Sequence, residues 1–415
     1  MTAQPRTAGQ HNLDVDLSSP DLDSDPFPTY AKMRQYAPAY WWEPADSWVL
    51  TRYQDVVMML RDPRFSPEYR HYKTAPPGLP DAELAQHQLL TKYGMFWMAS
   101  ADHGRVRRIV APVLASFGSA DVSGLLEAIA GQLLSAAAGQ DPYDVATDFA
   151  WRYPLRAITS MLGIPAEAQE EFRHFPSYGT AVLGEFFQAN SDEAFERNMA
   201  FLPRAVGMLN DLIEARRAQP CNDLLSALTH AEHAGEQLDN HELMAAVGLI
   251  LSAASRPVRY LIGLVILNLL KHPGQLRLLQ QDPRLLSPAI HEVGRFDNFG
   301  KLSLPRFAQD DIAIHGVTIR TGQQVHGSYT SAQRDPGAFP DPDRFDIRRD
   351  LTGSILFGDG RHTCMGRRLA ELTTAVAIRT FLTRFPAAQL AGEPQYARDT
   401  FFRKLSSLPV HLGSA

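Results

Sequence analysis

The chain has few cysteines, little net charge and no uninterrupted apolar run long enough to cross a membrane. Two cysteines among 415 residues exclude a disulfide framework and are typical of the reducing cytoplasm, where we expect this protein. The net charge of -6 gives no indication of nucleic acid or an anionic membrane as a partner. The longest apolar region, 243–270, is interrupted by Arg256, Pro257 and Arg259, which argues against a transmembrane helix.

Residues 1–20 are polar and lack both the basic start and the apolar middle of a signal peptide. We therefore expect neither a secretion signal nor a membrane anchor, and we interpret residues 1–20 as a disordered lead. The composition, 45% hydrophobic and 21% charged, is that of an ordinary globular chain with ample length for a core. Length alone would allow two or three domains.

Residues 357–371 combine several glycines, one of the two cysteines and the start of a helical pattern that runs from Leu369 to Leu382. A thiolate near a helix N-terminus is stabilised by the helix dipole and by free backbone N–H groups. Glycines let the backbone turn tightly and approach a flat ligand. Such a thiolate suits a single axial bond to a haem iron, whereas the ordinary alternative is a buried structural cysteine.

This stretch resembles the haem-ligand loop of the cytochrome P450 superfamily, whose pattern is Phe-x-x-Gly-x-x-x-Cys-x-Gly. Phe357, Gly360, Cys364 and Gly366 match that pattern, and His362 stands where many bacterial members place a haem-propionate ligand. The resemblance implies that Cys364 binds the iron of heme b (iron-protoporphyrin IX).

The resemblance covers about residues 25–412, and it implies the fold as well. We expect residues 21–415 to form a single cytochrome P450 domain that is mainly α with small β-sheets. The local patterns agree with the family's element order. They predict a helix that opens at residues 25–28 and ends at Tyr36, paired strands at 39–42 and 48–50, a helix over 53–61 and a hairpin over 311–319.

Further cations match the residues that hold the haem propionates in the family. His103 and Arg107 are four residues apart, so they share one face of a helix and could grip two carboxylates. Read without the family, the same pair is a solvated helix turn. The resemblance implies that His103 and Arg107 bind propionates and that Arg306 is a third propionate ligand.

A long apolar helix is predicted from residue 240 to residue 271, and it resembles the helix that crosses the distal haem face in the family. The family pattern Ala-Gly-x-(Asp/Glu)-Thr-Thr reads Ala-Ala-Ser-Arg-Pro-Val at residues 253–258. An acid and an alcohol normally relay protons to bound dioxygen. Arg256 stays protonated, and Pro257 has neither a hydroxyl nor an N–H, so this relay cannot operate through these side chains.

Three interpretations of this departure remain open. Arg256 could pair with a substrate carboxylate, as in hydrogen-peroxide-using fatty-acid hydroxylases of the superfamily, which carry an Arg-Pro pair. Alternatively, a substrate hydroxyl or a water serves as the relay for dioxygen, with help from Ser252 or Ser255. In the third interpretation Arg256 points away from the iron and caps carbonyls that Pro257 leaves without donors.

Two further groups of residues are expected to stabilise the cysteine loop and to line the substrate pocket. Glu292 and Arg295 match the family's Glu-x-x-Arg and, with Arg344, are expected to form a buried charge triad that fixes the loop holding Cys364. The aromatic-rich segments 67–98 and 171–204 correspond to the pocket's roof and lid in the family. The pocket residues that we expect are Phe96, Trp97, Phe186, Phe187, Ala253, Leu302 and Phe401.

The sequence thus predicts a haem-thiolate oxidoreductase that acts on a small organic molecule. The expected reaction is C–H hydroxylation, or oxidative coupling or rearrangement, in natural-product biosynthesis, with dioxygen and electrons from a ferredoxin and its reductase. The partner would dock at a basic patch of Arg108, Arg361, Arg367 and Arg368, unless that patch is only a solvated face. The alternatives are a peroxygenase acting on a carboxylate held by Arg256, and a non-catalytic haem-binding protein.

Overall fold

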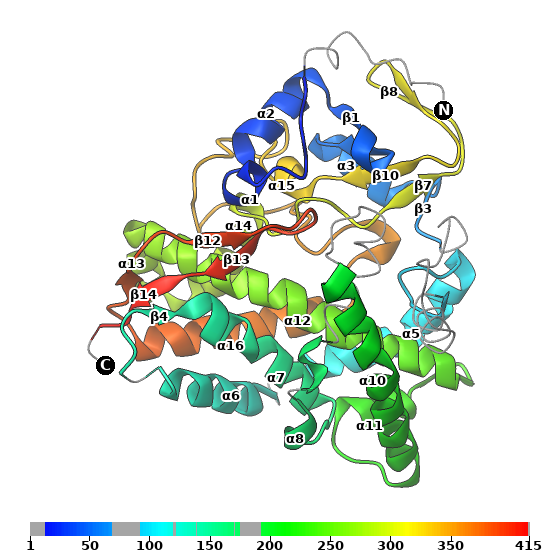
Figure 1. Ribbon diagram of the computed structural model, residues 1–415, viewed down its shortest axis with the longest axis vertical. Helices are drawn as coiled ribbons and strands as arrows, with labels where there is room; N and C mark the ends of the chain where they lie inside the picture. The colour runs from blue at the N-terminus through cyan, green and yellow to red at the C-terminus, as the bar shows by residue number, and fades with distance from the viewer. Residues whose placement is uncertain are drawn as a thin grey trace.

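The computed structural model describes residues 13–68, 92–118, 122–137, 139–169, 171–174 and 192–413. The five-stranded sheet and the first helices gather at one end of the molecule, and the long helices fill the other end, with β4 and β14 beside them (Figure 1). The expected fold, mainly α with small β-sheets, is confirmed. The α-helices are α1 Asp21–Ser24, α2 Phe27–Tyr36, α3 Tyr53–Arg61, α5 Ser100–Phe117, α6 Ser123–Ser135, α7 Arg152–Met161, α8 Ala166–Gln169, α10 Asp192–Ala218, α11 Leu224–Thr229, α12 Asn240–Lys271, α13 Pro273–Gln281, α14 Leu286–Phe296, α15 Tyr329–Ala332 and α16 Arg367–Arg384.

Shorter helical turns and fourteen short strands complete the described elements. The turns are η2 Glu43–Ala45, η5 Val145–Ala150, η6 Glu171–His174, η7 Pro283–Leu285 and η8 Gly360–His362. The strands are β1 Ala39–Trp42, β2 Ser47–Leu50, β3 Phe65–Ser66, β4 Tyr143–Asp144, β5 Glu232–His233, β6 Glu236–Gln237, β7 Arg306–Ala308, β8 Ile312–Ile314, β9 Val317–Ile319, β10 Gln324–Gly327, β11 Gln389–Leu390, β12 Gln395–Ala397, β13 Lys404–Ser407 and β14 Pro409–His411.

The largest sheet has the strand order β1-β2-β10-β7-β3. β1 and β2 pair antiparallel, with Trp41 opposite Trp48, and β10 runs parallel to β2. Trp48, Val56 and Val325 join β2, α3 and β10 in one apolar cluster. The predicted strands 39–42 and 48–50, the helices over 27–36 and 53–61 and the hairpin of β8 and β9 are all present.

Helix α12 is the central helix of the helical end, and it packs against α7, α14 and α16 (Figure 1). Asp239 and Glu242 form a capping box, which fixes the start of α12 at Asn240. Among the described helices α12 alone is long and apolar enough to cross a membrane, but 72% of its most apolar window is buried inside the protein. Its hydropathy is therefore that of a core helix.

The segment that precedes α1 is part of the fold from residue 13 onward. Leu17 is 2% exposed and belongs to an apolar cluster with Tyr40 and Phe401. The hydroxyl of Tyr40 accepts a hydrogen bond from the N–H of Val15 and donates one to its carbonyl. The prediction of a disordered lead is therefore wrong for residues 13–20. Leu17 is buried in an apolar cluster, and the polar composition of the segment gave no indication of this contact. Residues 1–12 lie outside the described part of the chain.

A buried group of charges joins α1 to the hairpin of β12 and β13. Lys301 Nζ lies 2.5 Å from a carboxylate oxygen of Asp23, and the two side chains are 2% and 5% exposed. Arg403 forms an ion pair with Asp297 and donates a hydrogen bond of 2.9 Å to the carbonyl of Ser24. These contacts hold the start of the described chain against the loop between β12 and β13.

Candidate active site

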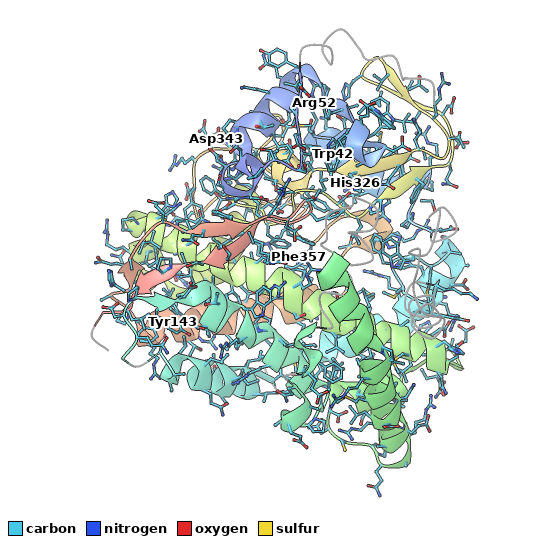
Figure 2. All side chains as sticks on the ribbon, viewed as in Figure 1. Trp42, Arg52, Tyr143, His326, Asp343 and Phe357 are labelled. Carbon is cyan, nitrogen blue, oxygen red and sulfur yellow. The ribbon has the colours of Figure 1, made fainter. Side chains whose placement is uncertain are left out.

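A cavity of ≈ 280 Å³ lies between α5, α7, α12 and the loop that precedes α16. Figure 2 labels Phe357, from this loop, at the boundary between the sheet-rich and helical ends of the molecule. The lining is mainly apolar. The cavity is lined by Met95, Phe96, His103, Arg107, Leu114, Pro154, Ala157, Ile158, Met161, Leu249, Ile250, Ala253, Ala254, Val258, Leu304, His362, Thr363, Cys364, Met365, Gly366, Leu369, Ala370 and Thr373.

The loop before α16 places Cys364 in the wall of this cavity. Gly360 has φ +68°, and a Cβ atom there would lie 2.5 Å from the carbonyl oxygen of Leu60, so the turn requires glycine. The backbone N–H of Cys364 donates to the carbonyl of Phe357 at 2.9 Å, which closes the loop. The surface that Cys364 leaves exposed faces the cavity. Burial raises the pKa of the Cys364 thiol, and the hydrogen bond from the N–H of Gly366 opposes this effect.

Cationic and imidazole groups gather beside Cys364, and their roles as propionate ligands stay predictions. The rings of His103 and His362 lie 4.2 Å apart, and the Arg306 guanidinium lies 5.0 Å from the centre of the Phe96 ring. Arg107 donates a hydrogen bond of 2.8 Å to the carbonyl of Thr363. Burial and then nearby arginines lower the pKa of His103 to about 4. Burial, followed by Arg306 and His103, lowers the pKa of His362 to about 2.

This donor set fits a haem group. The Nδ1 atom of His103 is buried and has no hydrogen-bond partner among the described residues, so the site offers an unused polar atom next to Arg107 and His362. Two propionates would supply acceptors for these donors, and the sulfur of Cys364 would supply an axial ligand. The Arg367 guanidinium lies 5.3 Å from the centre of the Phe357 ring, and Phe357 is not part of the described lining.

The charge triad forms, but with a different third member. Arg295 Nε and Glu292 Oε2 are 2.7 Å apart, and both side chains are fully buried. The Arg344 side chain is 68% exposed and pairs with Asp346, so the prediction for Arg344 was wrong. The third member is Arg349, whose Nε atom lies 3.3 Å from Oε1 of Glu292. Its guanidinium also donates to the carbonyls at 340, 341 and 344, and these acceptors turn it inward.

Helix α12 presents only apolar side chains to the cavity. Among the described residues Ser252, Ser255, Arg256 and Pro257 are absent from the lining. Arg256 is 7% exposed, and its guanidinium lies 3.5 Å from the Tyr260 hydroxyl. The hydroxyl of Ser255 donates to the helix carbonyl of Leu251 at 2.6 Å. Arg256 is thus not part of the described cavity lining, and the capping role of the third interpretation stays a prediction. The catalytic roles of these four residues stay predictions.

The predicted pocket residues divide into three groups. Phe96 and Ala253 line the cavity, and Phe186 and Phe187 lie outside the described residues. Trp97, Leu302 and Phe401 pack in the apolar cluster around Leu17, so their assignment to the lining was wrong.

Backbone pairing explains the third group. The carbonyl of Phe401 accepts hydrogen bonds from the N–H groups of Lys301 and Leu302, which turns this part of the hairpin loop into the core. Sequence reasoning missed Leu304 and Val258, which do line the cavity. Val258 follows the helix period from Ala254 and could have been found from that spacing.

The four arginines of the predicted docking patch are all exposed. Arg367 pairs with Glu371 at 2.8 Å, and Arg361 donates a hydrogen bond to the hydroxyl of Ser100. Arg108 projects from α5, whereas Arg367 and Arg368 begin α16. Arg361, Arg367 and Arg368 thus lie in or directly after the loop that carries Cys364, and α5 packs against α16.

Known proteins resemble the chain over nearly its whole length. Residues 43–400 match the family model described as "Cytochrome P450". The epothilone C/D epoxidase of Sorangium cellulosum is 36% identical, and the match covers 95% of this chain and 94% of that protein. The vitamin D(3) 25-hydroxylase of Pseudonocardia autotrophica is 35% identical, with 96% of each chain covered.

Solved structures agree with this assignment. The crystal structure of epothilone D-bound cytochrome P450epoK superposes with a TM-score of 0.88 at 33% identity, and the match covers 97% of this chain and 100% of that chain. The family model, these relatives and the cysteine-centred cavity together lead to one conclusion. The chain belongs to the cytochrome P450 family and is a haem-thiolate monooxygenase.

Proposed function

We propose that this enzyme oxidises a neutral, largely apolar natural product, by C–H hydroxylation or by oxidative coupling or rearrangement, with dioxygen as the oxidant. The observation that carries the proposal is the distal face of the cavity. Its lining from α12 consists of Leu249, Ile250, Ala253, Ala254 and Val258, while Arg256 is not part of the described lining. An apolar wall favours an apolar substrate surface and gives an anionic group no described partner there.

The cofactor is proposed to be heme b. Cys364 would hold its iron, and His103, Arg107, Arg306 and His362 would bind its propionates. The haem supplies the iron at which oxygen is activated, and thiolate ligation favours O–O cleavage. The protein itself excludes water from the reacting carbon of the substrate and orients that carbon. Both effects come from the apolar lining of α12 and from Phe96.

The relatives support this reaction class. One is named for epoxidation of epothilones C and D and another for hydroxylation of vitamin D(3). Electrons are proposed to come from a ferredoxin that docks at Arg108, Arg361, Arg367 and Arg368, which the structure leaves exposed. We propose the cytoplasm as the location, because that is where such a partner would be available.

The test is a spectral titration of the ferric protein with matched acids and methyl esters, starting with dodecanoic acid and methyl dodecanoate. The low-spin to high-spin shift reports binding next to the iron. We expect esters and bulkier neutral molecules to bind at least as well as acids, and Arg256→Ala to change the affinity for acids less than about threefold.

A carboxylate-dependent peroxygenase would give the opposite result. Only the acids would bind, and Arg256→Ala would weaken the binding of these acids by about 2–5 kcal/mol, the cost of breaking a desolvated charge pair. A purely haem-binding protein would form no product from any bound molecule, whether peroxide or a reductase system is supplied.

A further inference from the structure

A second hollow lies across α7 from the cavity beside Cys364. It is a groove of ≈ 960 Å³ between α6, α7, α8 and β13, and these three helices lie together at the helical end of the molecule (Figure 1). Pro154 and Ala157 of α7 line the first cavity, whereas Leu155 and Arg156 line the groove. At about 100° per residue, the two pairs lie on opposite faces of α7. We call this hollow the outer groove, and α7 separates it from the haem site.

Apolar side chains of the outer groove reach the protein surface. Leu125 on α6 is 40% exposed, and Trp151, directly before α7, is 38% exposed. Among the described residues these are two of the three exposed large hydrophobic side chains, the third being Tyr36. Exposed apolar side chains that share one concave wall indicate a binding site. The volume of the groove is within the range of about 300–1,000 Å³ that is typical of small-molecule sites.

The charged side chains in the described lining of the outer groove are all cationic. They are Arg152 and Arg156 on α7 and Lys404 on β13. Arg152 pairs with Asp148 at 3.7 Å, and both side chains of this pair are partly exposed. Within the described part of the chain, neither Arg156 nor Lys404 forms an ion pair. The groove therefore offers two cations to an anionic group of a ligand.

A buried arginine adds to the positive charge behind the groove. The guanidinium of Arg259, on α12, lies 3.6 Å from the centre of the Trp151 ring, and the Lys404 ammonium lies 5.5 Å from it. Arg259 is 9% exposed and donates a hydrogen bond of 2.9 Å to the Tyr260 hydroxyl. Its Nε atom has no hydrogen-bond partner among the described residues. The indole ring is thus fixed by two cations, and the wall that it forms favours an anion.

We propose that the outer groove binds an amphiphilic carboxylate, that is, a free long-chain acid. Its apolar chain packs against Leu125 and Trp151, and its carboxylate pairs with Arg156 and Lys404. The concave shape, formed by several elements, fits a small molecule better than the flatter surface of a protein partner. This site goes beyond the oxidation proposed above, because α7 lies between its ligand and the haem site.

The experiment follows the five tryptophans of the haem-loaded, carbon monoxide-bound protein by ¹⁹F NMR after labelling with 5-fluorotryptophan. Trp151 reports on the outer groove. Trp97 reports on the first cavity, because the centre of its ring lies 4.6 Å from that of Phe96, which lines this cavity. Each resonance is assigned by its loss in Trp151→Phe or Trp97→Phe. The probe is sodium dodecanoate below its micelle-forming concentration, and methyl dodecanoate is its uncharged match.

We expect dodecanoate to shift the Trp151 resonance with a saturable dependence on concentration. Methyl dodecanoate should bind at this site roughly tenfold more weakly, since it forms no charge-assisted hydrogen bonds. The doubly substituted protein Arg156→Ala with Lys404→Ala should also bind dodecanoate about tenfold more weakly. Arg320→Ala, at a residue whose side chain is 61% exposed next to β9, is the matched control and should leave the affinity unchanged.

The proposal is overturned if dodecanoate shifts only the Trp97 resonance or neither resonance, or if acid and ester bind equally well at Trp151. The comparison of acid with ester needs no substituted arginine or lysine, so it does not depend on the folding of the double variant. A Trp151 resonance that responds to phosphatidylglycerol vesicles and not to dodecanoate would assign the groove to a lipid surface, which also overturns the proposal. These outcomes leave the proposed oxidation intact, because that function is judged by the spin-state titration.

Discussion

At the scale of single residues, the buried ions beneath the cysteine loop show how the fold fixes Cys364. Glu292 and Arg295 are fully buried, and such a pair is stable only when further hydrogen bonds satisfy it. Arg295 also donates to the carbonyls of Gln333 and Pro342, at 3.2 and 2.8 Å. Next to it, a Cβ atom on Gly294 would lie 2.5 Å from the Leu356 side chain, so α14 directly supports the start of the loop.

The contrast between Arg349 and Arg344 gives a prediction at this scale. Arg349→Ala removes a partner of buried Glu292 and three carbonyl contacts, so it should lower the free energy of unfolding by about 2–4 kcal/mol. Arg344→Ala removes a side chain that is 68% exposed and should change that free energy by less than about 0.5 kcal/mol. Urea unfolding of the two variants checks both values. Equal losses would mean that the triad includes Arg344 after all.

At the scale of elements, a charged contact ties α1 to the loop between β12 and β13. Asp23 holds the buried ammonium of Lys301, while the backbone N–H of Lys301 donates to the carbonyl of Phe401 at 2.7 Å. The isolated bridge between Gly300 and Phe402 continues this pairing. The hairpin loop is thereby positioned by α1, through residues that are not part of the described cavity lining.

Asp23→Ala should leave Lys301 buried without its carboxylate and cost about 3–5 kcal/mol of stability. Asp21→Ala, in the same short helix but exposed, is the matched control and should change stability by less than about 0.5 kcal/mol. The double variant Asp23→Ala with Lys301→Met should recover most of the loss, because no unpaired charge remains. Thermal or urea unfolding that shows no recovery would refute this account.

Local signals explain which elements could be predicted from the sequence. Proline in the first turn of α2 and the acidic cap before α12 mark helix starts within the chain itself, and both boundaries were found. The cysteine loop was found because its glycines and Cys364 are close in sequence. The partners of Glu292 and the position of Phe401 depend on contacts between distant segments, and no local pattern distinguishes Arg344 from Arg349.

At the scale of the whole molecule, the charge near the cysteine loop is opposite in sign to the net charge of the chain. The chain is acidic overall at -6, yet Arg361, Arg367 and Arg368 lie exposed in or directly after the cysteine loop, and exposed Arg108 lies on α5, which packs against α16. An acidic electron donor would be repelled by the average surface and attracted to this patch. The cavity, by contrast, is lined mainly by apolar side chains, so electrons and substrate are expected to reach the haem from different surfaces.

Docking at this patch predicts a salt-dependent rate of reduction. The doubly substituted protein Arg108→Ala with Arg368→Ala should be reduced by a ferredoxin roughly tenfold more slowly at low salt, since rim charges mainly set association rates. Arg284→Ala, at a residue whose side chain is 91% exposed and distant in sequence from the patch, should leave the rate unchanged. Anaerobic stopped-flow measurements check this. Rates that are insensitive to both salt and the substitutions would place the partner elsewhere.

The apolar surface of α12 affects how the chain folds while the ribosome synthesises it. α12 is as hydrophobic as a membrane span. Of the three helices that contact it most, α7 precedes it in the sequence, whereas α14 and α16 follow. During synthesis the ribosome therefore releases α12 before the helices that complete its burial exist. In that interval its apolar surface must be shielded by chaperones or by transient collapse, and the yield of folded protein should depend on how quickly the last third of the chain follows.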